Sequence, residues 1–124
     1  MSKHPYRSHV IYSDDHGKSW MLGSVHDEKT NESAVVELTG GDVLQSMRSY
    51  HNKGSRAMAK SVDGGLNFEQ LYHAEGIKTI TIQGSMLRVE WQQMESGSRS
   101  LIVLSNPCGP HIEKMRVYLN YDEG

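Results

Sequence analysis

One short pattern, Ser-x-Asp-x-Gly-x-x-aromatic, occurs twice in this 124-residue chain and constrains its fold more than any other feature. The first copy spans residues 13–20 and the second spans residues 61–68. A third copy opens at Asn120, and the sequence stops at Gly124 before the aromatic position is reached. Repeats that start 48 and 59 residues apart predict an array of similar supersecondary units, and we expect the array to continue past Gly124.

Each copy has the chemistry of a tight turn. The glycine at the fifth position permits a positive φ, and the Asp carboxylate and Ser hydroxyl can accept backbone N–H groups within their own loop. We expect the terminal aromatic ring to pack beneath the turn and fix it to its sheet. The key positions are Ser13, Asp15, Gly17 and Trp20 in the first copy and Ser61, Asp63, Gly65 and Phe68 in the second. The repeat therefore predicts a structural corner rather than a catalytic device.

A calcium loop is the competing interpretation of these aspartates. An EF-hand loop supplies oxygen ligands over 12 residues and ends in a bidentate Glu. The twelfth position counted from Asp15 is His26, and counted from Asp63 it is Ala74. Both counts fail, so we expect no calcium site here.

Composition bounds the class of protein. The chain has 13 basic and 15 acidic residues, which argues against a strongly basic nucleic-acid binder. No apolar run approaches the roughly 20 residues of a membrane helix, and the first nine residues lack the apolar segment of a signal peptide. The seven His residues and the single Cys108 lack metal-ligand spacing, so we expect no metal and no cofactor. The sequence assigns no cellular compartment.

The apolar segments are short, rich in β-branched residues and bounded by Gly, Asn and Asp, which is typical of strands. No window has helical periodicity, and no linker divides residues 1–124, so we expect one all-β domain. The predicted strands are 9–13, 33–38, 43–49, 57–61, 69–73, 79–83, 86–92, 100–105 and 115–120.

The repeat resembles the Asp box, or bacterial neuraminidase repeat, of the sialidase family. Residues 31–38, the Gly40-Gly41 pair and residues 45–48 are similar to the catalytic-glutamate hairpin of exo-sialidases. Residues 83–88 and 105–107 look like two later sialidase signatures in the expected order. The resemblance implies a six-bladed β-propeller, of which this chain would form two to three blades, with the remaining blades as its partner.

The resemblance also implies an activity, the hydrolysis of terminal sialic acids from glycoproteins, glycolipids or oligosaccharides by an exo-α-sialidase. Such enzymes use a Tyr nucleophile with a carboxylate base, and arginines bind the substrate carboxylate. Glu32 matches the base, and Arg48 matches one of three arginines. Tyr50 is a weaker candidate for the lining of the site. A secreted or lysosomal location would be compatible with the resemblance.

Strand register decides whether Glu32 and Arg48 share a face, because side chains alternate along a strand. A two-residue loop at Gly40-Gly41 would place the two side chains on opposite faces. A three-residue loop formed by residues 40–42 would pair Glu32 with Tyr50 and Ala34 with Arg48. We therefore predict a loop of odd length.

The chain departs from the family pattern at one position and lacks other parts. The third substrate-binding arginine falls on Ile112, with Lys114 and Arg116 close by. We expect the first arginine and the acid/base Asp to lie upstream of Met1, and the Tyr nucleophile to lie beyond Gly124. The chain alone would then be catalytically incomplete and poorly stable in isolation. A sialoglycan-binding protein without activity, or an Asp-box propeller that binds protein partners, are the alternatives.

Overall fold

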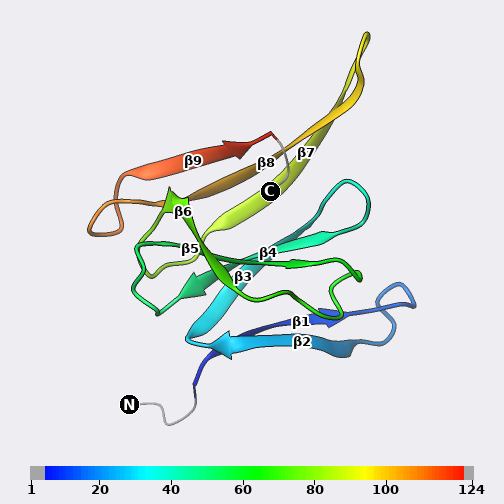
Figure 1. Ribbon diagram of the computed structural model, residues 1–124. Helices are drawn as coiled ribbons and strands as arrows, with labels where there is room; N and C mark the ends of the chain where they lie inside the picture. The colour runs from blue at the N-terminus through cyan, green and yellow to red at the C-terminus, as the bar shows by residue number, and fades with distance from the viewer. Residues whose placement is uncertain (1–4, 122–124) are drawn as a thin grey trace.

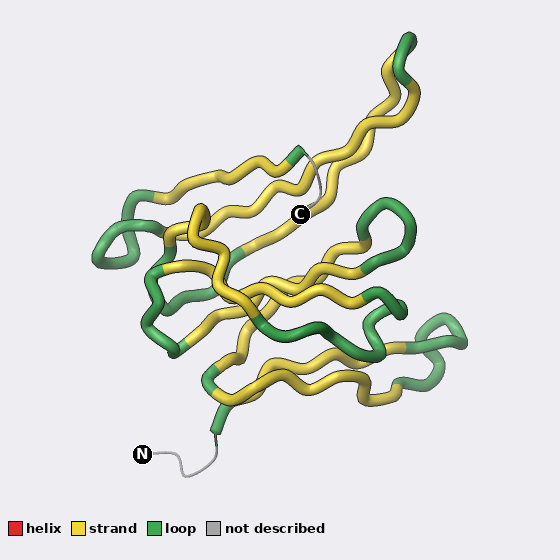
Figure 2. The backbone as a smooth tube through the Cα atoms, viewed as in Figure 1, coloured by secondary structure: helices red, strands yellow, loops and turns green. Residues whose placement is uncertain are grey.

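The computed structural model describes residues 5–121, which form nine strands in three antiparallel sheets (Figures 1 and 2). The strands are β1 (Arg7–Tyr12), β2 (Met21–Glu28), β3 (Thr30–Glu37), β4 (Val43–Ser49), β5 (Ser55–Ser61), β6 (Tyr72–Lys78), β7 (Ser85–Gln93), β8 (Gly97–Pro107) and β9 (Met115–Asn120). Nowhere in residues 5–121 is there a helix long and apolar enough to cross a membrane. The all-β prediction is confirmed.

The three sheets are consecutive blades of a propeller. The middle sheet has the order β3-β4-β5-β6, preceded by a two-stranded sheet, β1-β2, and followed by a three-stranded sheet, β7-β8-β9. Strand β3 also contacts β1 and β7, so the first strand of the middle sheet lies against both neighbouring sheets (Figure 1). Strands that pair in sequence order, with the sheets packed side by side, are the arrangement expected of two to three blades.

One face of the middle sheet packs against the third sheet, and the other face is covered by the sheet's own β5–β6 connection. Alternate residues, including Val36, Leu44 and Met58, form an apolar cluster with Ile102 and Leu104 of β8. The opposite face buries Met47, Ala57 and Ala59 beneath Phe68 and Leu71 of the β5–β6 connection. The sheet is therefore buried on both sides, as the inner layer of a stack of blades must be.

A polar network joins the first sheet to the second face of the middle sheet. His26 Nε2 lies 2.8 Å from Gln45 Oε1, and the Gln45 amide donates to Ser8 Oγ at 3.2 Å and to Ser33 Oγ at 3.0 Å. Buried polar groups need such partners, because each unpaired one costs about 1–3 kcal/mol.

The first Asp box has the bonding expected from its sequence. Asp15 accepts the backbone N–H of Ser19 at 2.8 Å, and Ser13 Oγ accepts the N–H of Gly17 at 2.8 Å. Gly17 has a φ of 83°. The side-chain and backbone hydrogen bonds from Ser19 lower the pKa of Asp15 to about 2.

The second Asp box repeats this geometry. Asp63 accepts the N–H of Asn67 at 2.9 Å, and Ser61 Oγ accepts the N–H of Gly65, whose φ is 92°. The backbone and side-chain bonds from Asn67 lower the pKa of Asp63 to about 2. The turn prediction is confirmed for both copies. Of the third copy, residues 122–124 lie outside the described residues.

The aromatic residues of the two boxes behave differently. Phe68 packs against the buried face of the middle sheet and edge-on against His26, at a centroid distance of 4.9 Å. Trp20 approaches Gly17 but keeps 59% of its surface exposed. The predicted packing beneath the turn therefore holds for Phe68, while Trp20 is covered only in part.

Two strand predictions are wrong, and one strand was not predicted. Strand β2 has no counterpart among the predicted strands, and β6 begins at Tyr72 and ends at Lys78 instead of spanning 69–73. Residues 79–83, predicted as a strand, form the β6–β7 connection. There the N–H of Thr79 bonds to the Gly54 carbonyl and the Ile82 carbonyl accepts a side-chain bond from Arg56, so tertiary contacts override β propensity.

Candidate functional site

The hairpin between β3 and β4 sets the positions of the two predicted site residues. The N–H of Leu38 bonds to the Asp42 carbonyl at 2.7 Å, which closes a three-residue loop at 39–41 with a φ of 92° at Gly40 and 95° at Gly41. The loop has odd length, as predicted. It lies one residue earlier than predicted, however, so Ala34 pairs with Ser46, and the predicted pairs Glu32–Tyr50 and Ala34–Arg48 are wrong.

The register of the β3–β4 hairpin places Glu32 opposite Arg48, directly beside an irregularity in β3. Thr30 pairs with Ser49 and Ser33 pairs with Met47, so two residues, Asn31 and Glu32, lie opposite Arg48 alone. Such a bulge bends the strand and re-aims side chains, and bulges are common next to active sites. Both side chains lie at the end of the sheet where β3 begins and β4 ends.

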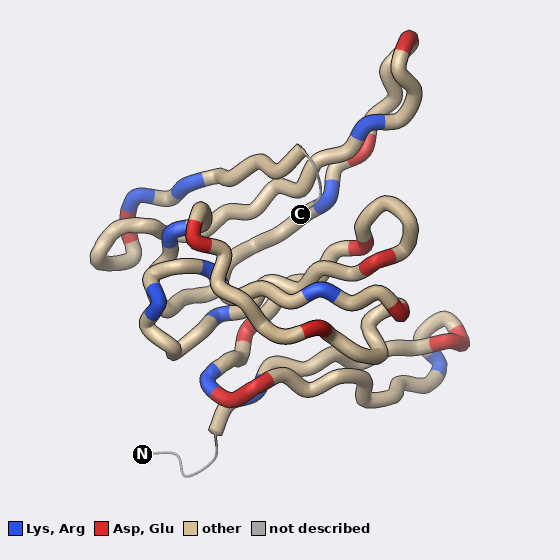
Figure 3. The backbone as a smooth tube through the Cα atoms, in the orientation of Figure 1, with Lys and Arg blue, Asp and Glu red and all other residues tan. Residues whose placement is uncertain are grey.

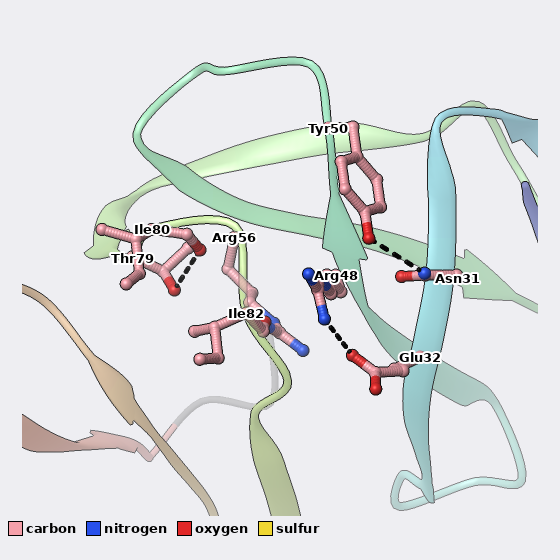
Figure 4. A network of polar contacts seen from close by, with 8 residues as sticks. All are labelled: Asn31, Glu32, Arg48, Tyr50, Arg56, Thr79, Ile80 and Ile82. Carbon is pink, nitrogen blue, oxygen red and sulfur yellow. Dashed lines mark hydrogen bonds and ion pairs between the residues drawn. The ribbon is translucent and has the colours of Figure 1, made fainter. Parts of the chain in front are cut away.

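The two side chains form an ion pair. Arg48 Nη1 lies 2.8 Å from Glu32 Oε2, and this hydrogen bond raises the pKa of Arg48 (Figure 4). The Arg48 guanidinium also lies over the ring of Tyr50, 5.1 Å from its centroid. Asn31 Nδ2 donates to the Tyr50 hydroxyl at 3.3 Å, and Tyr6 stacks on Tyr50. Tyr50 therefore contacts Arg48 and orients it.

Two buried polar atoms at this site have no partner within residues 5–121. They are Asn31 Oδ1 and Arg48 Nε, which make no hydrogen bond there. The side chains of Glu32 and Arg48 nevertheless remain 49% and 27% exposed. The site therefore places a solvent-accessible proton acceptor, the Glu32 carboxylate, next to an anion-binding group, the Arg48 guanidinium.

A second arginine lies behind the first. Met47 of β4 pairs with Ala57 of β5, so the same register places Arg56 opposite Arg48. Arg56 is 1% exposed and belongs to the face of the sheet that carries Glu32 and Arg48. An arginine in the sequence Ser55-Arg56-Ala57-Met58-Ala59, among small and apolar residues, is the sequence signal for such a buried cation.

Comparison with known proteins identifies the fold and the family. No family model matches. A sialidase of Micromonospora viridifaciens is 30% identical over 116 residues, which cover 92% of this chain and 18% of that protein. A sialidase of Paraclostridium sordellii is 42% identical over 65 residues, which cover 52% of this chain and 16% of that protein. The chain belongs to the sialidase family.

Solved structures agree on the fold of this sialidase-family chain. The Hadza microbial sialidase Hz136 superimposes with a TM-score of 0.76 at 23% identity, over 92% of this chain and 22% of that one. The NanB sialidase from Streptococcus pneumoniae gives 0.75 at 19% identity, over 97% of this chain and 19% of that one. The chain thus spans about a fifth of the length of the relatives it matches.

Ile112, the residue that we predict at the position of the third family arginine, lies in the β8–β9 connection. Ile112 is 76% exposed there. The connection is closed by bonds from the Cys108 N–H and thiol to the Lys114 carbonyl, and Lys114 has a φ of 53°. Basic segments cluster at this end of the sheets, where β4 ends and β9 begins (Figure 3). Arg116 pairs with Asn106, so Lys114 and Arg116 lie where β8 ends and β9 begins.

A histidine pair missed from the sequence lies beside a cavity. Ser49 Oγ lies 2.7 Å from His51 Nδ1 and 3.3 Å from His73 Nε2. Burial, followed by the charges of His51 and Lys53, lowers the pKa of His73. Ser49 also lines a cavity of about 280 Å³ between the β4–β5 and β6–β7 connections. Within residues 5–121, no three His, Cys, Asp or Glu side chains gather as a metal site would require.

Proposed function

We propose that this chain is a segment of a retaining exo-α-sialidase that removes terminal sialic acids from glycoproteins, glycolipids or oligosaccharides. The observation that carries the proposal is the ion pair of 2.8 Å between Glu32 and Arg48, at the end of a sialidase-type blade where β3 begins and β4 ends. The sialidase relatives support the class of substrate.

The chemistry of the substrate explains why these residue types are needed. A sialic acid glycoside carries a carboxylate next to its anomeric carbon, where an oxocarbenium ion develops as the leaving group departs. A carboxylate nucleophile would be repelled there, so sialidases use Tyr. A phenol with an ordinary pKa of about 10 is a weak nucleophile unless a base removes its proton. We assign that task to Glu32, acting on a Tyr outside this chain.

Arg48 would bind the substrate carboxylate. A guanidinium stays charged at neutral pH and offers parallel N–H donors that match a carboxylate. Tyr50 holds the Arg48 guanidinium against its ring, which reduces the freedom lost when substrate binds. In the free protein, Glu32 occupies Nη1 of Arg48, so an incoming carboxylate competes with or joins that ion pair.

The test uses the complete protein that contains this chain and a fluorogenic α-sialoside. Glu32→Gln keeps the shape of the side chain and removes its basicity, so kcat should fall by about 10²–10⁴-fold. Glu37→Gln, on the same strand, is the matched control and should leave turnover unchanged. Unchanged turnover in Glu32→Gln would remove Glu32 from the mechanism.

A second candidate function is sialoglycan binding without turnover. It is favoured by Ile112, which is exposed where the family pattern has an arginine. Without that contact, the substrate carboxylate would lose about 1.5–3 kcal/mol of binding. A protein that binds sialylated oligosaccharide but releases no sialic acid from any linkage would support this candidate.

A further inference from the structure

Arg56 is the most completely buried large side chain of the row that begins with Glu32. It lies on β5 opposite Arg48, and Arg48 lies opposite the Asn31–Glu32 bulge. Like charges directly opposite each other on a sheet are destabilising, so two neighbouring arginines need a compensating anion. Within this row, Glu32 is that anion.

Two bonds fix the Arg56 guanidinium. Nε donates to Ser46 Oγ at 2.8 Å, and Nη1 donates to the Ile82 carbonyl at 2.6 Å. Gly84 packs closely against the Arg56 guanidinium. A Cβ added at this glycine would lie 3.0 Å from Arg56 Cζ, so a larger residue would displace the guanidinium. Arg56 thus connects the middle sheet to the segment that leads into β7.

The third nitrogen, Nη2, is buried and makes no hydrogen bond with any residue in the described part of the chain. The guanidinium points toward Arg48 and Glu32 (Figure 4). Burial lowers the pKa of Arg56 to about 10, the Glu32 carboxylate raises it, and the Arg48 cation lowers it further. Arg56 therefore remains charged at neutral pH, in a position where its charge acts on Glu32.

We propose that Arg56 is a positioning residue, a buried cation that stabilises the Glu32 carboxylate when a substrate carboxylate takes over Arg48. This role rests on the proposed function. In the free protein one guanidinium neutralises Glu32, but with substrate bound, two carboxylates share Arg48 and repel each other. A fixed second positive charge, shielded from water, offsets that repulsion without contacting the substrate.

A matched pair of variants separates the effect of the Arg56 charge from the effect of its hydrogen bonds to Ser46 and the Ile82 carbonyl. Arg56→Lys keeps the charge and loses the planar fork, while Arg56→Gln keeps a donor for the Ile82 carbonyl and loses the charge. In the complete protein, Arg56→Gln should lower kcat for a fluorogenic sialoside at least about tenfold, with KM changed by less than about threefold. Arg56→Lys should retain kcat within about threefold of the wild type. Both should lower Tm.

Gly84→Ala serves as a second variant, because it displaces the guanidinium and leaves the charge in place. It should lower Tm with a smaller loss of kcat than Arg56→Gln. If the loss of kcat instead follows the loss of Tm across all three variants, or if Arg56→Gln retains full kcat, Arg56 has only a structural role and the proposal is overturned. If the wild type releases no sialic acid, the proposed function fails, and this role fails with it.

Discussion

Glu32 Oε2 lies 2.8 Å from Arg48 Nη1, so these side chains neutralise each other in the free protein. The register of the β3–β4 hairpin sets this pair, and a bulge beside it places Asn31 opposite Arg48 as well. A substrate carboxylate would meet a guanidinium whose Nη1 is already occupied. Replacing Arg48 therefore affects both the binding of substrate and the setting of Glu32.

Arg48→Lys should raise KM for a sialoside more than it lowers kcat. Lysine keeps the charge but loses the two-pronged donor, and the loss of a charge-assisted contact of about 1.5–3 kcal/mol corresponds to roughly 10- to 150-fold in KM. Steady-state rates of the complete protein measure this. Arg7→Lys is the control, since Arg7 forms an exposed pair with Glu28 at the same distance, 2.8 Å. Equal KM values for the two variants would contradict the role given to Arg48.

Asp63 should make the stability of the protein depend on acid. Its pKa is about 2 in the folded chain, below the ordinary 3.8, so its contribution is present above pH 3.8 and is lost as the pH falls toward 2. Asp63→Asn should lower Tm at neutral pH and flatten the decline of Tm in that acid range. Thermal unfolding at several pH values measures both effects. Asp14→Asn, at the variable second position of the first Asp box, is the control and should leave the wild-type dependence of Tm on pH in place.

The aromatic residues of the two Asp boxes should contribute different amounts to the free energy of unfolding. Phe68→Ala removes a ring from the buried face of the middle sheet and should lower the free energy of unfolding by about 2–4 kcal/mol. Trp20→Ala removes a ring that is 59% exposed and should cost less than about 1 kcal/mol. Urea unfolding of both variants provides the comparison. A larger loss for Trp20 would show that its ring is covered in the complete protein.

Ile112→Arg should strengthen sialoside binding. It restores a guanidinium at the family position in the β8–β9 connection, close to the basic end of the sheets. We expect KM to fall by about tenfold, in line with one added charge-assisted contact. Ile112→Gln provides a control of similar size without the charge. If the new arginine tightens binding while no sialic acid is released, the non-catalytic candidate gains support.

Much of the fold could be predicted from local sequence. The bounds of β4 and β9 are those predicted, and both Asp boxes form the expected turns, because bonds within a few residues determine them. Strand β2 was missed because most of its side chains are exposed and its apolar residues do not alternate. The Thr- and Ile-rich residues 79–83 were predicted as a strand, but Arg56 and Gly54 hold them as a connection.

The candidate site, like the fold, could be predicted from the sequence only in part. The resemblance and the parity of the loop indicated that Glu32 and Arg48 share a face, but the exact pairing depends on where the loop lies, and the bulge beside the pair depends on both strands. The pair formed by His51 and His73 could not be found from spacing, because strand pairing brings together residues that are distant in sequence. Arg56 required the position of Ile82, which sequence periodicity does not give.

The bond from Arg56 to the Ile82 carbonyl spans 26 residues, whereas the Asp-box bonds span at most four. Contacts that are distant in sequence close long loops and so form later and more slowly than local ones. The turns and hairpins of each blade can therefore form before Arg56 is locked in place. The charged row would then be the last part of the middle sheet to become ordered, and a chain with intact blades could still lack a working site until its neighbouring blade has docked.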